Sequence, residues 1–145
     1  MFNKKLNLAI EALAYISLNS SQKAVSSKDI CEALEVKLRY TESLMQQLVK
    51  AGVVKGVRGA GGGYFLANDR RKISVAEIYE IVENLKNERT DDSRSPFSAL
   101  SDEVNQTLEG CVRKALGDIT MDEIYNKALK IRSGTGKNRK SDFVI

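Results

Sequence analysis

Three features of the sequence predict a mainly α-helical fold with one small β-hairpin. Apolar residues recur at helical spacing over most of the chain. Three segments repeat the same helix-start pattern. Residues 54–66 instead place a glycine cluster between short runs of Val, Tyr, Phe and Leu, which is typical of two strands joined by a tight turn.

Composition narrows the class of protein. The 145 residues are 42% hydrophobic and 29% charged, enough for one domain with a core. No stretch approaches the roughly 20 apolar residues of a membrane span, and no secretory signal is visible, so we expect no membrane partner and a cytoplasmic location. The chain has two Cys, no CxxC pair and no His, so we expect neither an enzyme with catalytic residues nor a metal site.

The charge is unevenly distributed. Residues 1–72 carry twelve Lys and Arg against six Asp and Glu, whereas residues 73–145 carry eleven against thirteen. A basic first half suits a polyanionic partner, although chance segregation would give a similar excess.

The predicted helices follow from spacing and start signals. Helical spacing predicts a helix over 7–19. A hydroxyl cap with a carboxylate three residues on, flanked by apolar residues, begins helices at 27–34, 75–85 and 121–131. A further helix is predicted over 38–51, closed by Gly52. Its predicted inward residues are Leu44, Met45, Leu48 and Val49.

A short helix, a three-residue turn and a longer helix with polar outward residues form the helix-turn-helix pattern, although an ordinary pair of helices looks similar. The glycine-rich stretch that follows lacks the Lys of a phosphate loop, and Tyr64 replaces the last Gly of a dinucleotide fingerprint. The alternatives that remain are an ordinary hairpin with a mobile tip and a wing. The combined order predicts a winged helix-turn-helix domain, with the second helix in the major groove and Arg58 in a narrow minor groove.

The run Arg58-Gly59-Ala60-Gly61-Gly62-Gly63-Tyr64, with the preceding helix from Leu44, resembles the Rrf-two family of bacterial winged helix-turn-helix regulators. The likeness extends from about Lys5 to Ala128, and Ala60 stands where the family usually has Pro. The resemblance implies a homodimeric transcriptional regulator, a repressor that occludes a two-fold operator in double-stranded DNA. The alternative is an interaction module that docks a protein partner, such as an enzyme, with weak or no DNA binding.

The resemblance also implies the contact residues. Arg39 would bind guanine and Glu42 cytosine, although Glu42 is equally compatible with a solvated helix charge. Lys28, Lys37 and Lys50 are expected to contact phosphates, and Tyr40 either does so or is partly buried. The complete expected DNA-binding set is Lys28, Lys37, Arg39, Tyr40, Thr41, Glu42, Ser43, Lys50, Arg58, Gly59 and Gly61.

A narrow apolar stripe marks the predicted amphipathic helix at 97–116. Its residues are Phe97, Leu100, Val104, Leu108, Cys111 and Ala115. The family pairs its subunits here, whereas the alternative is a helix lying on its own core. Two copies of Cys111 could form a redox-sensitive disulfide, but we expect Cys111, like Cys31, to act as a small buried hydrophobe.

The expected organisation is a DNA-binding domain over 1–85 with its wing at 53–67. A polar loop (86–96), a dimerisation and packing region (97–132) and a basic flexible tail (133–145) follow. Cluster-bearing relatives hold three Cys in the loop that corresponds to 86–96, and this loop has none. Iron–sulfur clusters need Cys thiolates, with His as the usual replacement. We therefore expect no iron–sulfur cluster and no other cofactor.

Overall fold

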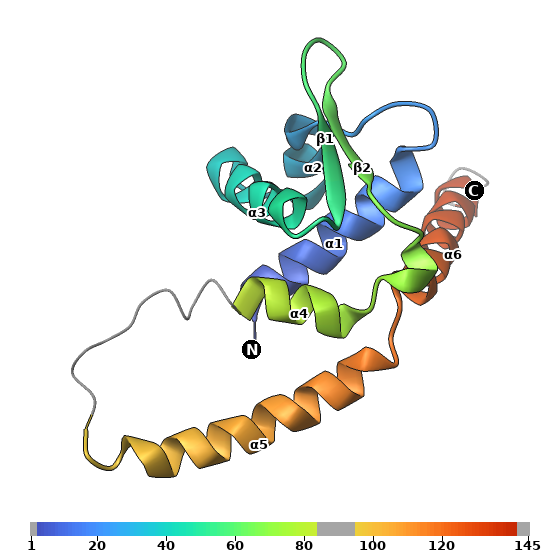
Figure 1. Ribbon diagram of the computed structural model, residues 1–145. Coiled ribbons are helices and arrows are strands. Elements are labelled where there is room, and N and C mark those ends of the chain that lie inside the picture. Colours follow the sequence, from blue (N-terminus) through green and yellow to red (C-terminus); the bar gives the residue numbers. More distant parts are fainter. Residues whose placement is uncertain (1–2, 84–94, 142–145) are drawn as a thin grey trace.

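The computed structural model describes residues 3–83 and 95–141, with side chains placed as far as residue 134. The described part confirms the predicted fold class, since it is mainly helical with one antiparallel hairpin (Figure 1). Its elements in chain order are α1 (Lys4–Asn19), α2 (Ser27–Leu34), α3 (Leu38–Lys50), β1 (Val54–Val57), β2 (Gly63–Leu66), the 3-10 helix η1 (Arg70–Lys72), α4 (Val75–Glu83), α5 (Ser98–Gly117) and α6 (Met121–Ser141).

Helix α1 is the centre of the core. Ala9, Ala12, Leu13 and Ile16 have no exposed surface, and α1 packs against α2, α4, α6 and β2. The alanines leave room for neighbouring helices, and each fully buried Leu or Ile stabilises the fold by about 1.5–3 kcal/mol. This core positions α3 and the base of the hairpin relative to each other.

The three predicted helix starts are confirmed. Ser26 caps α2 by accepting a hydrogen bond from the Asp29 amide at 3.1 Å, and the Asp29 carboxylate accepts one from the Ser26 amide at 3.3 Å. The cap hydroxyls of α4 and α6 accept in the same way from the amide three residues on. These two caps are Ser74 and Thr120.

The hairpin is fastened to the segment before α2. Within it, Val54 lies opposite Leu66 and Val57 opposite Gly63. Val25 and Tyr64 exchange two backbone hydrogen bonds, of 3.0 and 2.8 Å, so Val25 acts as a one-residue third strand. The hairpin is therefore tied to the start of α2 at mid-length.

Both ends of the chain differ from the prediction. Helix α1 begins at Lys4, because the Asn3 side chain accepts a hydrogen bond from the Leu6 amide at 3.1 Å and caps it. Helix α6 continues to Ser141, so the prediction of a flexible tail is wrong for 133–141. Extending a formed helix adds one hydrogen bond per residue, which favours continuation although two glycines there lower the helix propensity. The expected polar loop at 86–96 lies outside the described residues except for Ser95 and Pro96.

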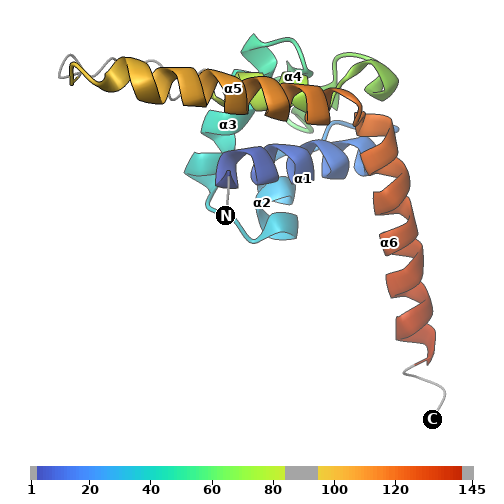
Figure 2. The same cartoon turned by 90° about the horizontal axis from the view of Figure 1, so that it is seen from below.

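Helix α5 lies along α4, and α6 then turns away and extends beyond the body (Figure 2). Arg113 of α5 pairs with Glu80 of α4 at 2.9 Å. None of the helices in the described ranges is long and apolar enough to cross a membrane.

Candidate nucleic-acid interface

Helix α3 buries one face and presents a polar face to solvent. Its buried residues are Thr41, Leu44, Met45 and Leu48. The opposite face is exposed and consists of Arg39, Glu42, Ser43, Gln46 and Lys50. Lys37 is the N-cap residue and is also exposed. The predicted base-contacting side chains therefore point away from the core.

Two predictions about α3 are wrong. Thr41 has no exposed surface, and its hydroxyl donates to the Lys37 carbonyl at 3.3 Å, so it is not accessible to DNA. Val49 does not belong to the inward face, since it is 38% exposed. It lies at the edge of the apolar face, where its neighbours are wing residues rather than the core. Tyr40 is 39% exposed and is accessible to a partner.

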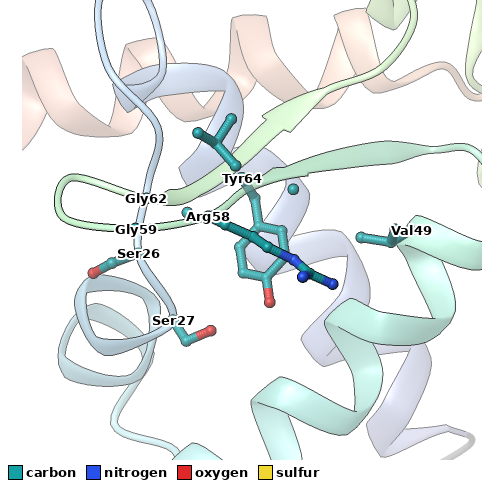
Figure 3. A pocket seen from close by; sticks show the side chains of 10 residues that line it. Ser26, Ser27, Val49, Arg58, Gly59, Gly62 and Tyr64 are labelled. Atoms are coloured by element: carbon teal, nitrogen blue, oxygen red, sulfur yellow. The ribbon is translucent and has the colours of Figure 1, made fainter.

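A cleft of about 450 Å³ separates the wing from the start of α2 and the end of α3. Its lining includes Ser26, Ser27, Val49, Arg58 and Tyr64. Arg58 directly follows β1 and is exposed; its side chain extends from the wing into the cleft beside Tyr64, toward α3 (Figure 3). The wing and the exposed end of α3 thus face a common cleft, and the positively charged side chain of Arg58 lies in it.

The glycines of the wing have two separate structural roles. Gly59 and Gly61 adopt φ of +96° and +74° with open space around them, so they allow the tight turn. Gly63 has φ of +154°, and a Cβ there would collide with the Val25 carbonyl. The missing side chain at Gly63 therefore lets the wing pack closely against the backbone of Val25 in the same chain.

The predicted phosphate-contacting lysines differ in their surroundings. Lys28 lies in the first turn of α2 and forms an exposed ion pair with Glu32 at 3.9 Å. The neighbouring carboxylate weakens the attraction of Lys28 for a phosphate. Lys37 and Lys50 lie at the two ends of α3. The structure thus places Lys side chains at both ends of α3, and Arg58 beside the cleft.

Sequence reasoning missed Leu38 and Val57 among the exposed residues of this face. Leu38, the first residue of α3, is 48% exposed, and Val57 at the end of β1 is 46% exposed. Apolar side chains at the start of a recognition helix are suited to contact thymine methyl groups. Helical spacing gave no signal for the exposure of Leu38, because it lies about one turn before Thr41, which is buried.

The apolar stripe of α5 faces away from its own domain. Phe97, Leu100, Val104 and Leu108 are 74%, 67%, 68% and 54% exposed, and Cys111 and Ala115 are exposed as well. The alternative of a helix lying on its own core by this stripe is therefore wrong. Within one chain, Cys111 is also not the buried hydrophobe that we expected, and Cys31 is half-buried.

No group of three or more His, Cys, Asp or Glu side chains suited to hold a metal ion occurs in the part of the chain that the structure describes. That part excludes residues 84–94, which include most of the loop at 86–96 on which the cofactor prediction rests. The expected absence of a cofactor remains a prediction.

Comparisons with known proteins agree with this geometry. A model of the Rrf2 family, described as an iron-dependent transcriptional regulator, matches residues 2–127. An HTH-type transcriptional regulator of Haemophilus influenzae is 35% identical over 123 residues, 82% of each chain. The HTH-type transcriptional regulator IscR of Vibrio campbellii is 33% identical over 129 residues, 85% of this chain and 77% of that one.

Solved structures extend the likeness to the fold. The structure of T. potens IscR superposes with a TM-score of 0.67 at 28% identity, covering 88% of each chain. Oxidized CymR of Staphylococcus aureus, at 24% identity, shares the fold with a TM-score of 0.65 over 86% of this chain and 95% of that one. The chain therefore belongs to the Rrf2 family and is a DNA-binding transcriptional regulator with a winged helix fold.

Proposed function

We propose that the protein is a homodimeric repressor that binds a two-fold operator, with α3 in the major groove and the wing in the adjacent minor groove. The observation that carries this proposal is the shared cleft. The end of α3, the start of α2 and Arg58 of the wing line the same 450 Å³ space, on a face that carries exposed cations. One duplex can contact both elements there.

In the major groove, the exposed face of α3 supplies the readout. Arg39 can donate two hydrogen bonds to guanine, and Glu42 can accept one from the cytosine amino group. Ser43 lies one turn beyond Arg39 on the same exposed face. The lysines at the two helix ends, Lys37 and Lys50, suit phosphate contacts, which give affinity and salt dependence.

In the minor groove, Arg58 supplies the charge. Its guanidinium rests in the cleft in the free protein and lies on a long, exposed side chain, so it can turn outward when a duplex approaches. Narrow A-tract minor grooves have an enhanced negative potential that favours such an arginine. At the wing tip Gly59 and Gly61 carry no side chains and Ala60 between them carries only a methyl group, which allows close approach to the backbone of the duplex.

Dimerisation would occur through the α5 stripe. Phe97 at the N-cap and five apolar or small side chains of α5 are exposed at steps of three or four residues, and a second copy can cover them by two-fold symmetry. A dimer presents two α3 helices to two half-sites about one helical turn apart. Repression follows where such an operator overlaps a promoter, and the site of action is the cytoplasm.

We also propose that the protein works without an iron–sulfur cluster. The whole sequence has only Cys31 and Cys111 and lacks His, so the usual ligand sets are missing. Protein purified without oxygen should be colourless, because a cluster held by thiolates would absorb visible light. Strong visible absorbance with stoichiometric iron and sulfide would contradict this proposal.

The test of the main proposal is selection of bound duplexes from a random DNA pool, followed by sequencing. An enriched two-fold motif supports a dimeric sequence-specific regulator, and Arg58→Ala should then weaken binding to that motif by roughly tenfold. Lys130→Ala on α6 removes the same charge far from the cleft and serves as the control. A folded protein that enriches no sequence at low salt would instead favour the interaction module that docks a protein partner.

A further inference from the structure

Arg70 joins the base of the wing to α6. It lies in η1, which begins four residues after β2 ends. Its Nε donates to the Asp122 carboxylate at 2.7 Å, and its guanidinium carbon lies 3.6 Å from the centre of the Tyr125 ring. Asp122 and Tyr125 lie about one turn apart on α6, so α6 holds the guanidinium from two directions.

This arrangement differs from an ordinary surface ion pair. The side chains of Arg70 and Asp122 are only 35% and 29% exposed, and the stacked ring fixes the orientation of the guanidinium. The neighbouring Arg71 provides the contrast, because it is 75% exposed and pairs with Asp69 within the same turn. Arg70 therefore connects two elements, whereas Arg71 connects none.

Backbone bonds extend the connection to α5. The Val75 amide donates to the Ile119 carbonyl and the Met121 amide donates to the Ile73 carbonyl, both at 2.8 Å. These bonds pair the residues that follow η1 with the short joint between α5 and α6. The wing thus leads into a segment that is hydrogen-bonded to the end of the stripe-bearing helix.

Other contacts fix the β1 side of the wing. The Val53 amide donates to the Leu48 carbonyl of α3 at 3.0 Å, and Val53 and Val54 are buried in the core. Val25 holds the hairpin at Tyr64, and the Asn68 side chain donates to the Gly52 carbonyl at 3.3 Å. The second of these bonds joins two residues of the wing region itself and adds no contact to the helical body. In the described residues, the Arg70 contacts are the side-chain hydrogen bond and ion pair that fix the end of the wing to α6.

We propose that Arg70 is a positioning residue for DNA binding, which orients the wing by holding its base against Asp122 and Tyr125 of α6. This inference rests on the proposed function, because it requires that the wing contacts DNA. Without Arg70 the hairpin would sample more orientations, and DNA binding would have to order it. Through the α5–α6 joint, the same contact makes wing orientation depend on the position of the stripe-bearing helix.

A double-mutant cycle tests the proposal with the full chain and the duplex selected from the random pool. Arg70→Ala should weaken binding about fivefold, a size typical of coupling between residues in one network. Arg71→Ala removes an equal charge from the same turn and should change affinity by less than about twofold. In the Arg58→Ala background, Arg70→Ala should have almost no further effect, because a wing without its contacting residue gains little from correct orientation.

Asp122→Asn is a second variant, since it weakens the ion pair with little change of shape. It should reduce DNA affinity as Arg70→Ala does, and it should likewise have almost no further effect in the Arg58→Ala background. Thermal unfolding of each variant shows how much fold stability changes. Equal losses from Arg70→Ala with and without Arg58 would indicate a fold-wide effect and overturn the proposal, as would no loss at all. If Arg58→Ala alone leaves the affinity for DNA unchanged, the wing does not contact DNA through Arg58. That result refutes the proposed wing contact as well as this inference, and it differs from equal losses in the cycle, which refute only this inference.

Discussion

The close approach of Gly63 to Val25 allows a quantitative prediction for Gly63→Ala. The new Cβ would overlap the Val25 carbonyl, so the hairpin must move away from the segment before α2. That movement breaks the two backbone hydrogen bonds between Val25 and Tyr64, each contributing about 0.5–1.5 kcal/mol. An Ala at φ of +154° adds strain of about 1–3 kcal/mol if the backbone stays in place. We expect the free energy of unfolding to fall by about 2–4 kcal/mol, because relaxation avoids part of the sum.

The matched control is Gly61→Ala. Gly61 also has a positive φ, +74°, but nothing lies within 4 Å of the position that a Cβ would take there, so only the left-handed conformation is penalised, by about 1–2 kcal/mol. Urea unfolding followed by circular dichroism, at one protein concentration and buffer, measures both variants. If Gly63→Ala is no more destabilising than Gly61→Ala, the collision with Val25 does not govern the stability of the wing, and the reasoning is refuted.

Three further predictions concern α5, α3 and η1. Leu100 is 67% exposed, so Leu100→Glu should change the free energy of unfolding by less than about 1 kcal/mol and give a folded monomer in sedimentation. A monomeric wild type or an unfolded variant would contradict this prediction. Thr41→Val removes the hydroxyl with little change of the buried shape, and it should change DNA affinity by less than about twofold in a titration. A larger loss of affinity at unchanged helicity would show that Thr41 contacts DNA. Hydrogen bonds from Arg71 lower the pKa of Asp69 from 3.8 to about 2, so the pair stabilises the fold above pH 3.8 and loses this effect as the pH falls toward 2. Arg71→Ala removes the side-chain hydrogen bonds but keeps the backbone amide that also donates to Asp69, so the pKa of Asp69 should rise only part of the way toward 3.8 in a carboxyl NMR titration. An unchanged value would exclude the Arg71 side chain as a cause.

Local signals explain what the sequence revealed about the fold. The Ser26, Ser74 and Thr120 caps each act on an amide three residues away, so their pattern is complete within a few positions of the chain. The hairpin likewise follows from neighbouring residues, because Gly59 and Gly61 supply the turn between two β-forming runs. The polar outward face of α3 also follows from helical spacing alone.

The missed features depend on parts of the chain that are distant in sequence. Thr41 and Val49 lie near the borders of the apolar face of α3, and spacing cannot say on which side of the border a residue falls. The approach of Gly63 to Val25, and the contact of Arg70 with Asp122 across 52 positions, exist only once the helices are packed. Residues 68–72 are visibly polar and basic in the sequence, but nothing local indicated which of Arg70 and Arg71 would reach α6.

The α5 stripe and the Arg70 contact together suggest how assembly and DNA binding are connected. A second copy that covers the exposed Leu100, Val104 and Leu108 would remove their side chains from water, at about 25 cal/mol for each Å² of apolar surface. The position that α5 takes in such a dimer sets the position of the joint that follows it. The backbone bond from Val75 to Ile119 in this joint connects it to the residues beside η1. Leu100→Glu should therefore weaken binding to the two-fold operator while leaving Arg70 against Asp122, whereas Arg70→Ala should leave the dimer intact and disturb only the wing. Sedimentation and DNA titration of the same two variants separate these effects, since loss of dimer in Arg70→Ala would place Arg70 in assembly rather than in wing orientation.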